Sequence, residues 1–337
     1  MIDCDVHCDV PDVETLMPYL PRHWQERLRE NRWSGPAGVR HCYPPAVAGD
    51  PIHDIGSLRE RVLTADTEAA IVTCYYAVES LRHPDLTADL AAAVNRWLQA
   101  EWLEPEPRLR AALVVPTLYP EAAAAEIRRW EWTDRFVHVL LPVVAQRTFG
   151  SRFYWPLYEA AQERGFVIGL HFGGVSGGPP TATGWPTYYV EEAADMANIF
   201  QGHLLSLVAE GVVREFPNLR FTLLESGVTW LPTLLWRLDK MWKSYRREVP
   251  WIDRLPSEYL RNRIRLTTQP LDGPEDAQKT LSYLREMELE QLLLYSSDEP
   301  HIHGSSSLDV LGLLQPEQQK LVLAENARAW YGITEAA

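Results

Sequence analysis

Short apolar runs of strand length recur along the chain, and longer segments with helical periodicity separate them. The eight runs are residues 2–6, 69–75, 109–115, 136–141, 166–171, 220–225, 264–268 and 292–297. They are nearly continuous rather than alternating, which is typical of strands buried on both faces of a parallel sheet. The intervening residues 86–103, 152–164 and 191–210 are predicted to form amphipathic helices, because their apolar residues share one helical face.

The number of strand–helix units decides the predicted fold. Eight units in succession predict an α/β fold, a (β/α)₈ TIM barrel formed by residues 1–337 as one domain. An open doubly wound sheet would show the same alternation, but no Gly-x-Gly-x-x-Gly follows the first strand, which argues against a dinucleotide-binding fold. Two long connections are predicted to be functional, namely a cap insertion at residues 8–60 and a Gly/Pro-rich lid at residues 172–190.

Composition and charge narrow the class of protein. The 46 acidic residues exceed the 32 Lys and Arg residues, giving a formal charge of −14, and 46% of residues are hydrophobic. This apolar content supports a full core and excludes a disordered acidic chain. The acidic excess argues against nucleic-acid binding, and the lack of a basic amphipathic segment argues against binding to a membrane surface.

Targeting and redox signals point to a cytoplasmic protein. The four cysteines (Cys4, Cys8, Cys42 and Cys74) all fall in the first quarter of the chain and do not form a disulfide framework. The chain begins without the positively charged start of a signal peptide, and no run approaches the ~18 apolar residues of a membrane span. We therefore expect a soluble enzyme or binding protein of a reducing compartment.

Acidic and histidine residues terminate four of the predicted strands. They are Asp5 and His7 on the first strand, His171 on the fifth, Glu225 on the sixth and Asp298 on the eighth, with His301 and His303 following. A single Asp-x-His pair is more often a structural hydrogen bond, but in a TIM barrel all these strand ends meet at one mouth. Such groups are costly to bury unless they are paired or bind a metal. Their convergence predicts a site for zinc, manganese or iron.

Several motifs, in order, resemble one family of metal-dependent barrels. They include Ile2-Asp3-Cys4-Asp5-Val6-His7, Leu170-His171-Phe172-Gly173-Gly174 and Ser297-Asp298-Glu299-Pro300-His301. The pattern resembles the amidohydrolase-related barrels that include aminocarboxymuconate-semialdehyde decarboxylase and resorcylate-type decarboxylases. The resemblance implies that Asp5, His7, His171 and Asp298 hold the metal and that Asp298 also moves a proton. It implies a hydrolase or non-oxidative decarboxylase of a small carboxylate-bearing substrate, and a homo- or hetero-oligomer.

One departure from the family pattern leaves alternatives open. Many members place a histidine after the sixth strand, where this chain has Glu225, which could act as a general base or as a further ligand. With His301 and His303 the candidate ligands exceed the three or four of a mononuclear site, for which zinc is expected. A dinuclear iron or manganese–iron oxygenase on the same fold is therefore an alternative. A non-catalytic partner subunit is a second alternative, although such a subunit would be expected to lose ligands.

Other residues receive structural or secondary interpretations. His203, on the apolar face of the 191–210 helix, is predicted to be buried and structural, and His138 to be an interior residue with a partner. Cys4 and Cys8 are predicted to act as small buried apolar residues. The remaining candidates for the mouth are three arginines that could bind a substrate carboxylate, three tryptophans and four histidines: Arg40, Arg59 and Arg147; Trp33, Trp185 and Trp230; His23, His41, His53 and His83.

Overall fold

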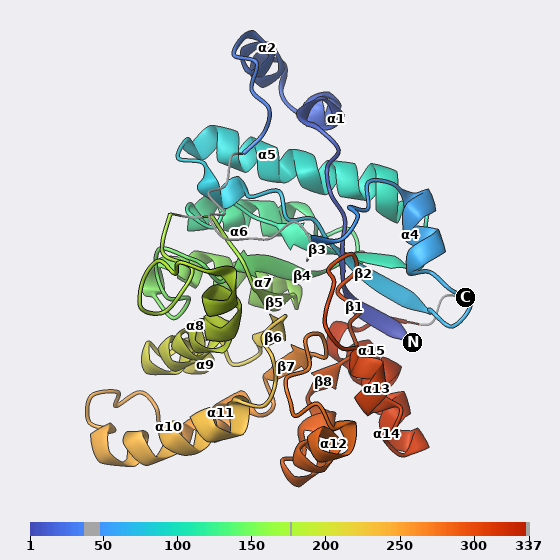
Figure 1. The fold of residues 1–337 in the computed structure, drawn as a ribbon. Helices are drawn as coiled ribbons and strands as arrows, with labels where there is room; N and C mark the ends of the chain where they lie inside the picture. The colour runs from blue at the N-terminus through green and yellow to red at the C-terminus, as the bar shows by residue number, and fades with distance from the viewer. Residues whose placement is uncertain (37–47, 176, 335–337) are drawn as a thin grey trace.

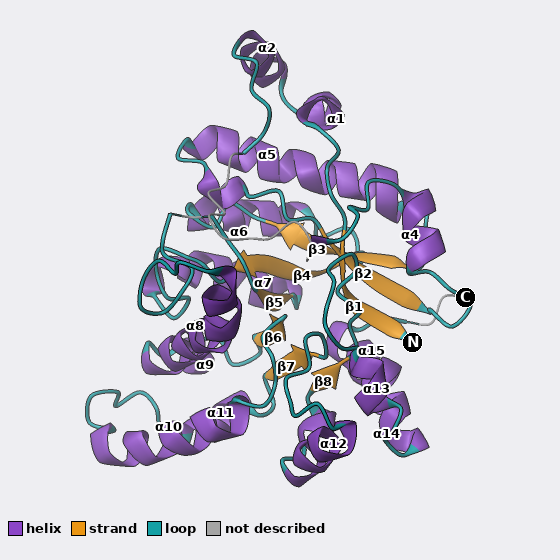
Figure 2. Cartoon of the chain, in the orientation of Figure 1, coloured by secondary structure: helices purple, strands orange, loops and turns teal. Residues whose placement is uncertain are grey.

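Eight parallel strands form the centre of the molecule and helices surround them (Figures 1 and 2). The computed structural model describes residues 1–36, 48–175 and 177–334. The strands are β1 Ile2–His7, β2 Ala69–Thr73, β3 Leu109–Val114, β4 Phe136–Pro142, β5 Val167–His171, β6 Arg220–Leu224, β7 Ile264–Thr267 and β8 Leu293–Leu294. Each pairs with its sequence neighbours, and the backbone bond from Cys4 N to Tyr295 O (2.9 Å) joins the last segment to the first. The predicted (β/α)₈ barrel is confirmed.

The helices lie outside the strands, as the predicted periodicity requires. They are α1 Val13–Leu16, α2 Arg22–Glu30, α4 Ile55–Arg61, α5 Pro84–Trp97, α6 Pro120–Arg129, α7 Trp155–Arg164, α8 Tyr189–Ala209, α9 Val212–Glu215, α10 Leu231–Tyr245, α11 Pro256–Leu260, α12 Ala277–Glu286, α13 Ser307–Leu311, α14 Pro316–Lys320 and α15 Asn326–Tyr331. The predicted helix 86–103 is α5 continued by a π-helical stretch, Leu98–Leu103. The predicted helices 152–164 and 191–210 correspond to α7 and α8.

The eighth strand is shorter than predicted. Residues 292–297 were expected to be extended, but only Leu293 and Leu294 keep regular strand pairing. Beyond them Ser296 N donates to Thr268 Oγ1 (3.1 Å), so a side-chain bond replaces the strand ladder. This irregular segment leads directly into Asp298, whose N–H donates to Asp5 O (3.1 Å) and so fixes the acid beside β1.

The predicted cap insertion falls into two parts. Helices α1 and α2 lie on the outer side of α5 (Figure 1), where Trp24 Nε1 donates to Asp89 Oδ2 (2.8 Å) and Arg96 Nη1 to Tyr19 O (2.7 Å). Within the described part of the cap, Asp9, Ala48 and Pro51 line the cavity at the barrel mouth. The predicted Arg40, His41 and Cys42 lie outside the described residues.

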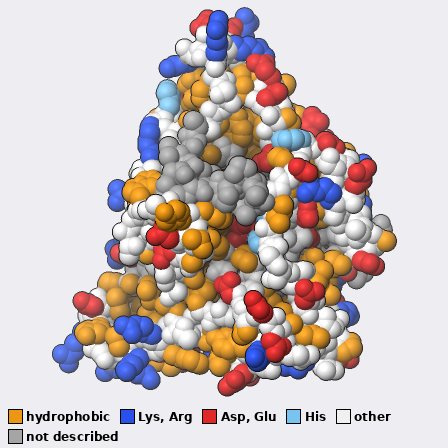
Figure 3. Space-filling view, viewed as in Figure 1, with side chains coloured by type: hydrophobic (Ala, Val, Ile, Leu, Met, Phe, Trp, Pro, Cys, Tyr) orange, Lys and Arg blue, Asp and Glu red, His pale blue; other side chains and the backbone are white. Residues whose placement is uncertain are grey.

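Acidic and basic side chains are interspersed on the face shown in Figure 3, with acidic and histidine atoms in the hollow near its centre. None of the helices within the described ranges is long and apolar enough to cross a bilayer.

Candidate metal centre

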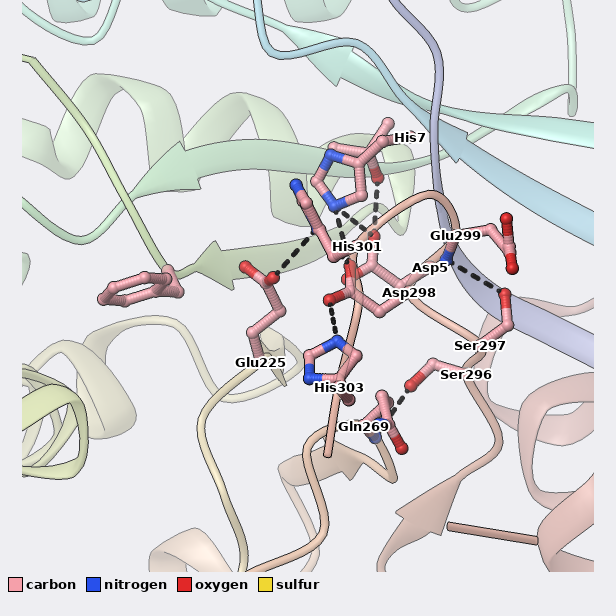
Figure 4. Close-up of polar contacts among 12 residues, drawn as sticks. Asp5, His7, Glu225, Gln269, Ser296, Ser297, Asp298, Glu299, His301 and His303 are labelled. Carbon is pink, nitrogen blue, oxygen red and sulfur yellow. Dashed lines mark hydrogen bonds and ion pairs between the residues drawn. The ribbon is translucent and has the colours of Figure 1, made fainter. Parts of the chain in front are cut away.

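The seven residues singled out at the strand ends lie together at one end of the barrel, and Figure 4 labels all of them except His171, which lies beside Asp5 and His7. They adjoin a cavity of about 860 Å³ whose lining includes His7, His171, Glu225, His301 and His303. Asp5 and Asp298 lie beneath this lining and are fully buried. The carboxyl ends of parallel barrel strands meet at one mouth, so residues distant in sequence become neighbours here.

Backbone conformation at two of these positions is unusual. Glu225 has φ 57° and Asp298 has φ 59°, in the left-handed region that non-glycine residues rarely adopt. Such a conformation costs on the order of 1–3 kcal/mol and persists where surrounding contacts enforce it. At Glu225 the enforcing contact includes its N–H, which donates to Thr267 Oγ1 (3.0 Å). Both residues therefore direct carboxylates to the mouth at an energetic cost, which is typical of functional positions.

Three of the buried polar atoms that make no hydrogen bond of good geometry within the described residues belong to this cluster. They are Asp5 Oδ2, His7 Nε2 and His171 Nε2. His171 Nε2 lies 3.3 Å from Asp5 Oδ2, and His7 Nε2 lies 3.8 Å from Asp5 Oδ1. One carboxylate and two imidazoles, buried and mutually close, form a donor set suited to a divalent transition metal. Buried polar atoms that make no hydrogen bond are costly, and a bound metal would offset that cost.

Supporting bonds orient this donor set. His171 Nδ1 donates to Phe172 O (2.8 Å), which leaves Nε2 directed to the site. Thr73 Oγ1 donates to Asp5 Oδ1 (3.1 Å) and fixes the carboxylate from the neighbouring strand. A metal ligand held by a backbone carbonyl or hydroxyl loses little freedom on binding, so the site is pre-organised.

Asp298 is the most heavily hydrogen-bonded acid of the cluster. Its Oδ1 lies 3.0 Å from His7 Nε2 and 3.0 Å from His301 Nδ1. Its Oδ2 lies 2.7 Å from His303 Nε2 (Figure 4). Glu225 completes the ring, with Oε1 3.5 Å from His301 Nδ1 and Oε2 3.2 Å from His171 Nδ1. His7, Glu225, Asp298 and His301 thereby form a second group with metal-ligand spacing.

The cluster shifts the pKa values of Asp298 and Glu225 in opposite directions. Burial alone would raise the pKa of Asp298, but the hydrogen bonds from His301 and His303 and the charge of His7 outweigh it and hold that pKa well below its usual range. Burial and the adjacent charge of Asp298 raise the pKa of Glu225. For His171, burial opposes protonation, yet the charges of Asp5 and Glu225 prevail and raise its pKa to about 9.

Two nearby acids hold the loop instead of joining the cluster. Asp3 Oδ1 accepts from Ser297 N (2.9 Å), and burial raises the pKa of Asp3 to about 7. Glu299 pairs with Arg61 across a distance of 2.6 Å. Gly49, at φ 65°, lies so close to Pro300 O that a Cβ would approach to 1.8 Å. These contacts fasten the loop that carries Asp298, His301 and His303.

The two interior histidines behave differently. His203 is buried as predicted, with Nε2 donating to Val143 O (2.8 Å) and Nδ1 accepting from Phe149 N (3.0 Å). The partner predicted for His138 is wrong: neither ring nitrogen has a hydrogen-bond partner within the described part of the chain. Its ring occupies the space beside Gly169, where a Cβ would lie 2.5 Å from His138 Cδ2. Burial lowers the pKa of His138 to about 4, so the ring is neutral.

The other candidate residues are sorted by the cavity lining. Cys4 and Cys8 are buried as predicted, and of the three tryptophans only Trp185 lines the mouth cavity. Arg59 instead pairs with Glu106 (2.9 Å), and Arg147 lines a smaller cavity. None of His23, His53 and His83 lines the mouth cavity. Sequence reasoning missed Arg82, which lines both cavities; its position after β2 was the available signal.

Comparison with known proteins identifies the family. The amidohydrolase family model matches residues 2–333, and the chain belongs to this family. Among solved structures it is similar to 2,6-dihydroxybenzoate decarboxylase from Rhizobium (20% identity, 98% of each chain covered, TM-score 0.71). It is also similar to 5-carboxyvanillate decarboxylase from Sphingomonas paucimobilis (19% identity, 99% of each chain, TM-score 0.70).

A third similar structure contains a metal. It is a dihydroxybenzoic acid decarboxylase from Polaromonas sp. JS666 with bound manganese and 2-nitroresorcinol (20% identity, covering 98% of this chain and 96% of that one, TM-score 0.70). No curated protein matches the chain in sequence. The predicted family is thus confirmed, and at these identities the structural likeness establishes the shared fold.

Proposed function

We propose that this protein is a metal-dependent non-oxidative decarboxylase of a small aromatic carboxylate. The observation that carries the proposal is a set of three buried atoms beside an open cavity, Asp5 Oδ2, His7 Nε2 and His171 Nε2, which lie close together and make no hydrogen bond within the described residues. The similar structures named above are decarboxylases of aromatic acids, and one holds manganese. The reaction converts R–CO₂⁻ and H⁺ to R–H and CO₂, so the site must bind a carboxylate and deliver one proton.

Different residues of the site would bind the metal and form the walls around the substrate ring. Asp5, His7 and His171 would hold a divalent metal, with Asp298 as the fourth ligand. When bound, the metal supplies a Lewis acid that holds an anionic oxygen of the substrate and offsets developing charge. Phe172 and Trp185 line the cavity and offer apolar walls to a planar ring.

Proton delivery is assigned to Glu225 because of its access to the cavity. Asp298 is fully buried and absent from the cavity lining, whereas Glu225 lines it. A general acid must lie within hydrogen-bond reach of the atom that it protonates. In this chain Asp298 therefore holds the metal and is itself held by His301 and His303, and Glu225 carries the proton. This assignment departs from the double role that the family resemblance implies for Asp298.

The test combines metal analysis with measurement of CO₂ release. Manganese- or zinc-loaded protein is incubated with 2,6-dihydroxybenzoate and 5-carboxyvanillate, and CO₂ is quantified. E225Q is expected to retain its metal and lower kcat by roughly 10²–10⁴-fold, as loss of a general acid does. D298N is expected to lose both metal and activity, and D309N, at an exposed acid of α13, to resemble the wild type. CO₂ release that is undiminished in E225Q would remove Glu225 from the mechanism, and no CO₂ from any aromatic acid would refute the proposal.

A second candidate function is favoured by the surplus of ligands. Two groups with metal-ligand spacing share His7, and together they include three carboxylates and three imidazoles. Two ions bridged by a carboxylate would use this set, as in a dinuclear oxygenase. Elemental analysis separates the candidates: about one ion per chain supports the decarboxylase, and two ions of iron or manganese with dioxygen uptake support the oxygenase.

A further inference from the structure

A smaller cavity of about 270 Å³ adjoins the metal-site cavity at the ends of β2, β3 and β4. Its described lining consists of Arg82, Leu118, Tyr119, Gln146, Arg147, Phe153 and Tyr154. Two arginines thus face a lining that, as far as it is described, includes no acidic residue, in a chain with a formal charge of −14. The described lining of the small cavity therefore carries positive charge, although the chain as a whole is acidic.

Arg82 joins this small cavity to the larger one, because its side chain lines both. Its Nη1 donates to Glu79 O (3.4 Å), and the Glu79 carboxylate accepts from Val175 N (3.2 Å) in the lid. The lid backbone passes close to the guanidinium at Gly177 (φ 94°), where a Cβ would lie 3.1 Å from Arg82 Nη2. Arg82 is therefore placed where the lid, the metal cavity and the small cavity meet.

Arg147 supplies the second cation from the loop after β4. Its guanidinium carbon lies 5.2 Å from the centre of the Phe153 ring, which orients the group by a cation–π contact. Stacking of this kind leaves the N–H groups at the edge of the guanidinium available to an anion. Tyr119 and Gln146 add a hydroxyl and an amide to the same lining.

We propose that Arg82 and Arg147 form an anion subsite for a second anionic group of the substrate, remote from the carboxylate at the metal centre. Guanidinium groups recognise carboxylate and phosphate by paired hydrogen bonds, and both groups share this chemistry. The inference rests on the proposed function for the ring that occupies the main cavity. It selects dianionic aromatic acids as the substrate class, with the second charge on the side of β2–β4.

The test measures binding to the metal-loaded protein by calorimetry. The ligands are benzoate, isophthalate, 3-(carboxymethyl)benzoate and 3-phosphonobenzoate. At least one dianion is expected to bind about tenfold more tightly than benzoate, because a charged pair of hydrogen bonds forms at the arginines. R82Q and R147Q are each expected to lose this gain and to bind benzoate within about twofold of the wild type. R22Q, at an exposed arginine of α2 that pairs with Glu26, is the matched control.

The outcomes separate this proposal from the proposed function. A gain with the dicarboxylates alone assigns the subsite to a carboxylate, and a gain with the phosphonate alone assigns it to a phosphoryl group. Equal binding of benzoate and all dianions, or a gain that persists in both R82Q and R147Q, overturns the subsite. Tight binding of dianions without CO₂ release from any aromatic acid overturns the decarboxylase and leaves the subsite intact.

Discussion

Two buried histidines of this protein have opposite surroundings. His203 on α8 bonds to the backbone through both ring nitrogens, to Phe149 N and Val143 O, and it stacks on the Phe149 ring at 4.5 Å. His171 at the end of β5 bonds to Phe172 O through Nδ1 only, and its Nε2 faces Asp5 at 3.3 Å. Burial lowers the pKa of His203 to about 4, whereas for His171 the charges of Asp5 and Glu225 outweigh burial and raise the pKa to about 9.

The comparison teaches that burial alone does not distinguish a structural histidine from a functional one. What differs is the use of the second nitrogen. A histidine with both nitrogens bonded to the backbone has nothing left to offer a ligand. A histidine with a single backbone bond and acidic neighbours keeps one ring nitrogen that can bind a metal, and the backbone bond orients its ring.

The largest expected effect concerns metal affinity. H171A removes a donor atom of the proposed metal centre and is expected to weaken metal binding on the order of 1000-fold, beyond the roughly 10–100-fold loss typical of a supporting residue. H203A is expected to leave metal affinity within about threefold of the wild type, because both of its nitrogens are bonded to the backbone. Competition with a chromogenic chelator measures both constants. Equal affinities for the two variants would show that His171 is not a ligand.

The next effect concerns the free energy of unfolding and the His203 site. H203A leaves the Phe149 N–H and the Val143 carbonyl without a partner and opens a cavity between α8 and the barrel. The expected loss in the free energy of unfolding is about 2–4 kcal/mol. Urea denaturation of metal-free protein measures it. H23A, at an exposed histidine of α2, serves as the control and is expected to change stability by less than about 0.5 kcal/mol. A loss in H203A no greater than in H23A would contradict the structural role.

The sequence predicts the barrel and the strand-end cluster for the same reason. Each buried parallel strand appears in the sequence as a local run of apolar residues. Alternation within β1 then places Asp5 and His7 on one side of the strand. Because topology then brings strand ends together, His171, Glu225 and Asp298 could be assigned to one mouth without any knowledge of the loops.

Features set by loops could not be predicted in this way. Arg82 lines two cavities and lies beside Gly177, a contact between segments almost 100 residues apart. Arg59, which was a candidate for substrate binding, is held by Glu106 instead. The left-handed conformation of Glu225 depends on the Thr267 hydroxyl of the next strand. Each of these depends on a pairing that no local pattern encodes.

The smallest effect is the contribution of His203 to the pH dependence of the free energy of unfolding. Burial keeps His203 neutral in the folded protein down to a pKa of about 4, whereas an ordinary histidine has a pKa of 6.5. As pH falls below 6.5 the unfolded chain binds a proton that the folded protein does not, so stability falls until pH nears 4. Between pH 7.5 and 5 this costs about 2 kcal/mol. H203Q removes the titration and retains a polar side chain at this position, and its urea-unfolding free energy is expected to fall by about 2 kcal/mol less than that of the wild type over this interval. Because His138 and the carboxylates titrate in both proteins, the difference isolates His203, and equal pH dependence would refute its neutral burial.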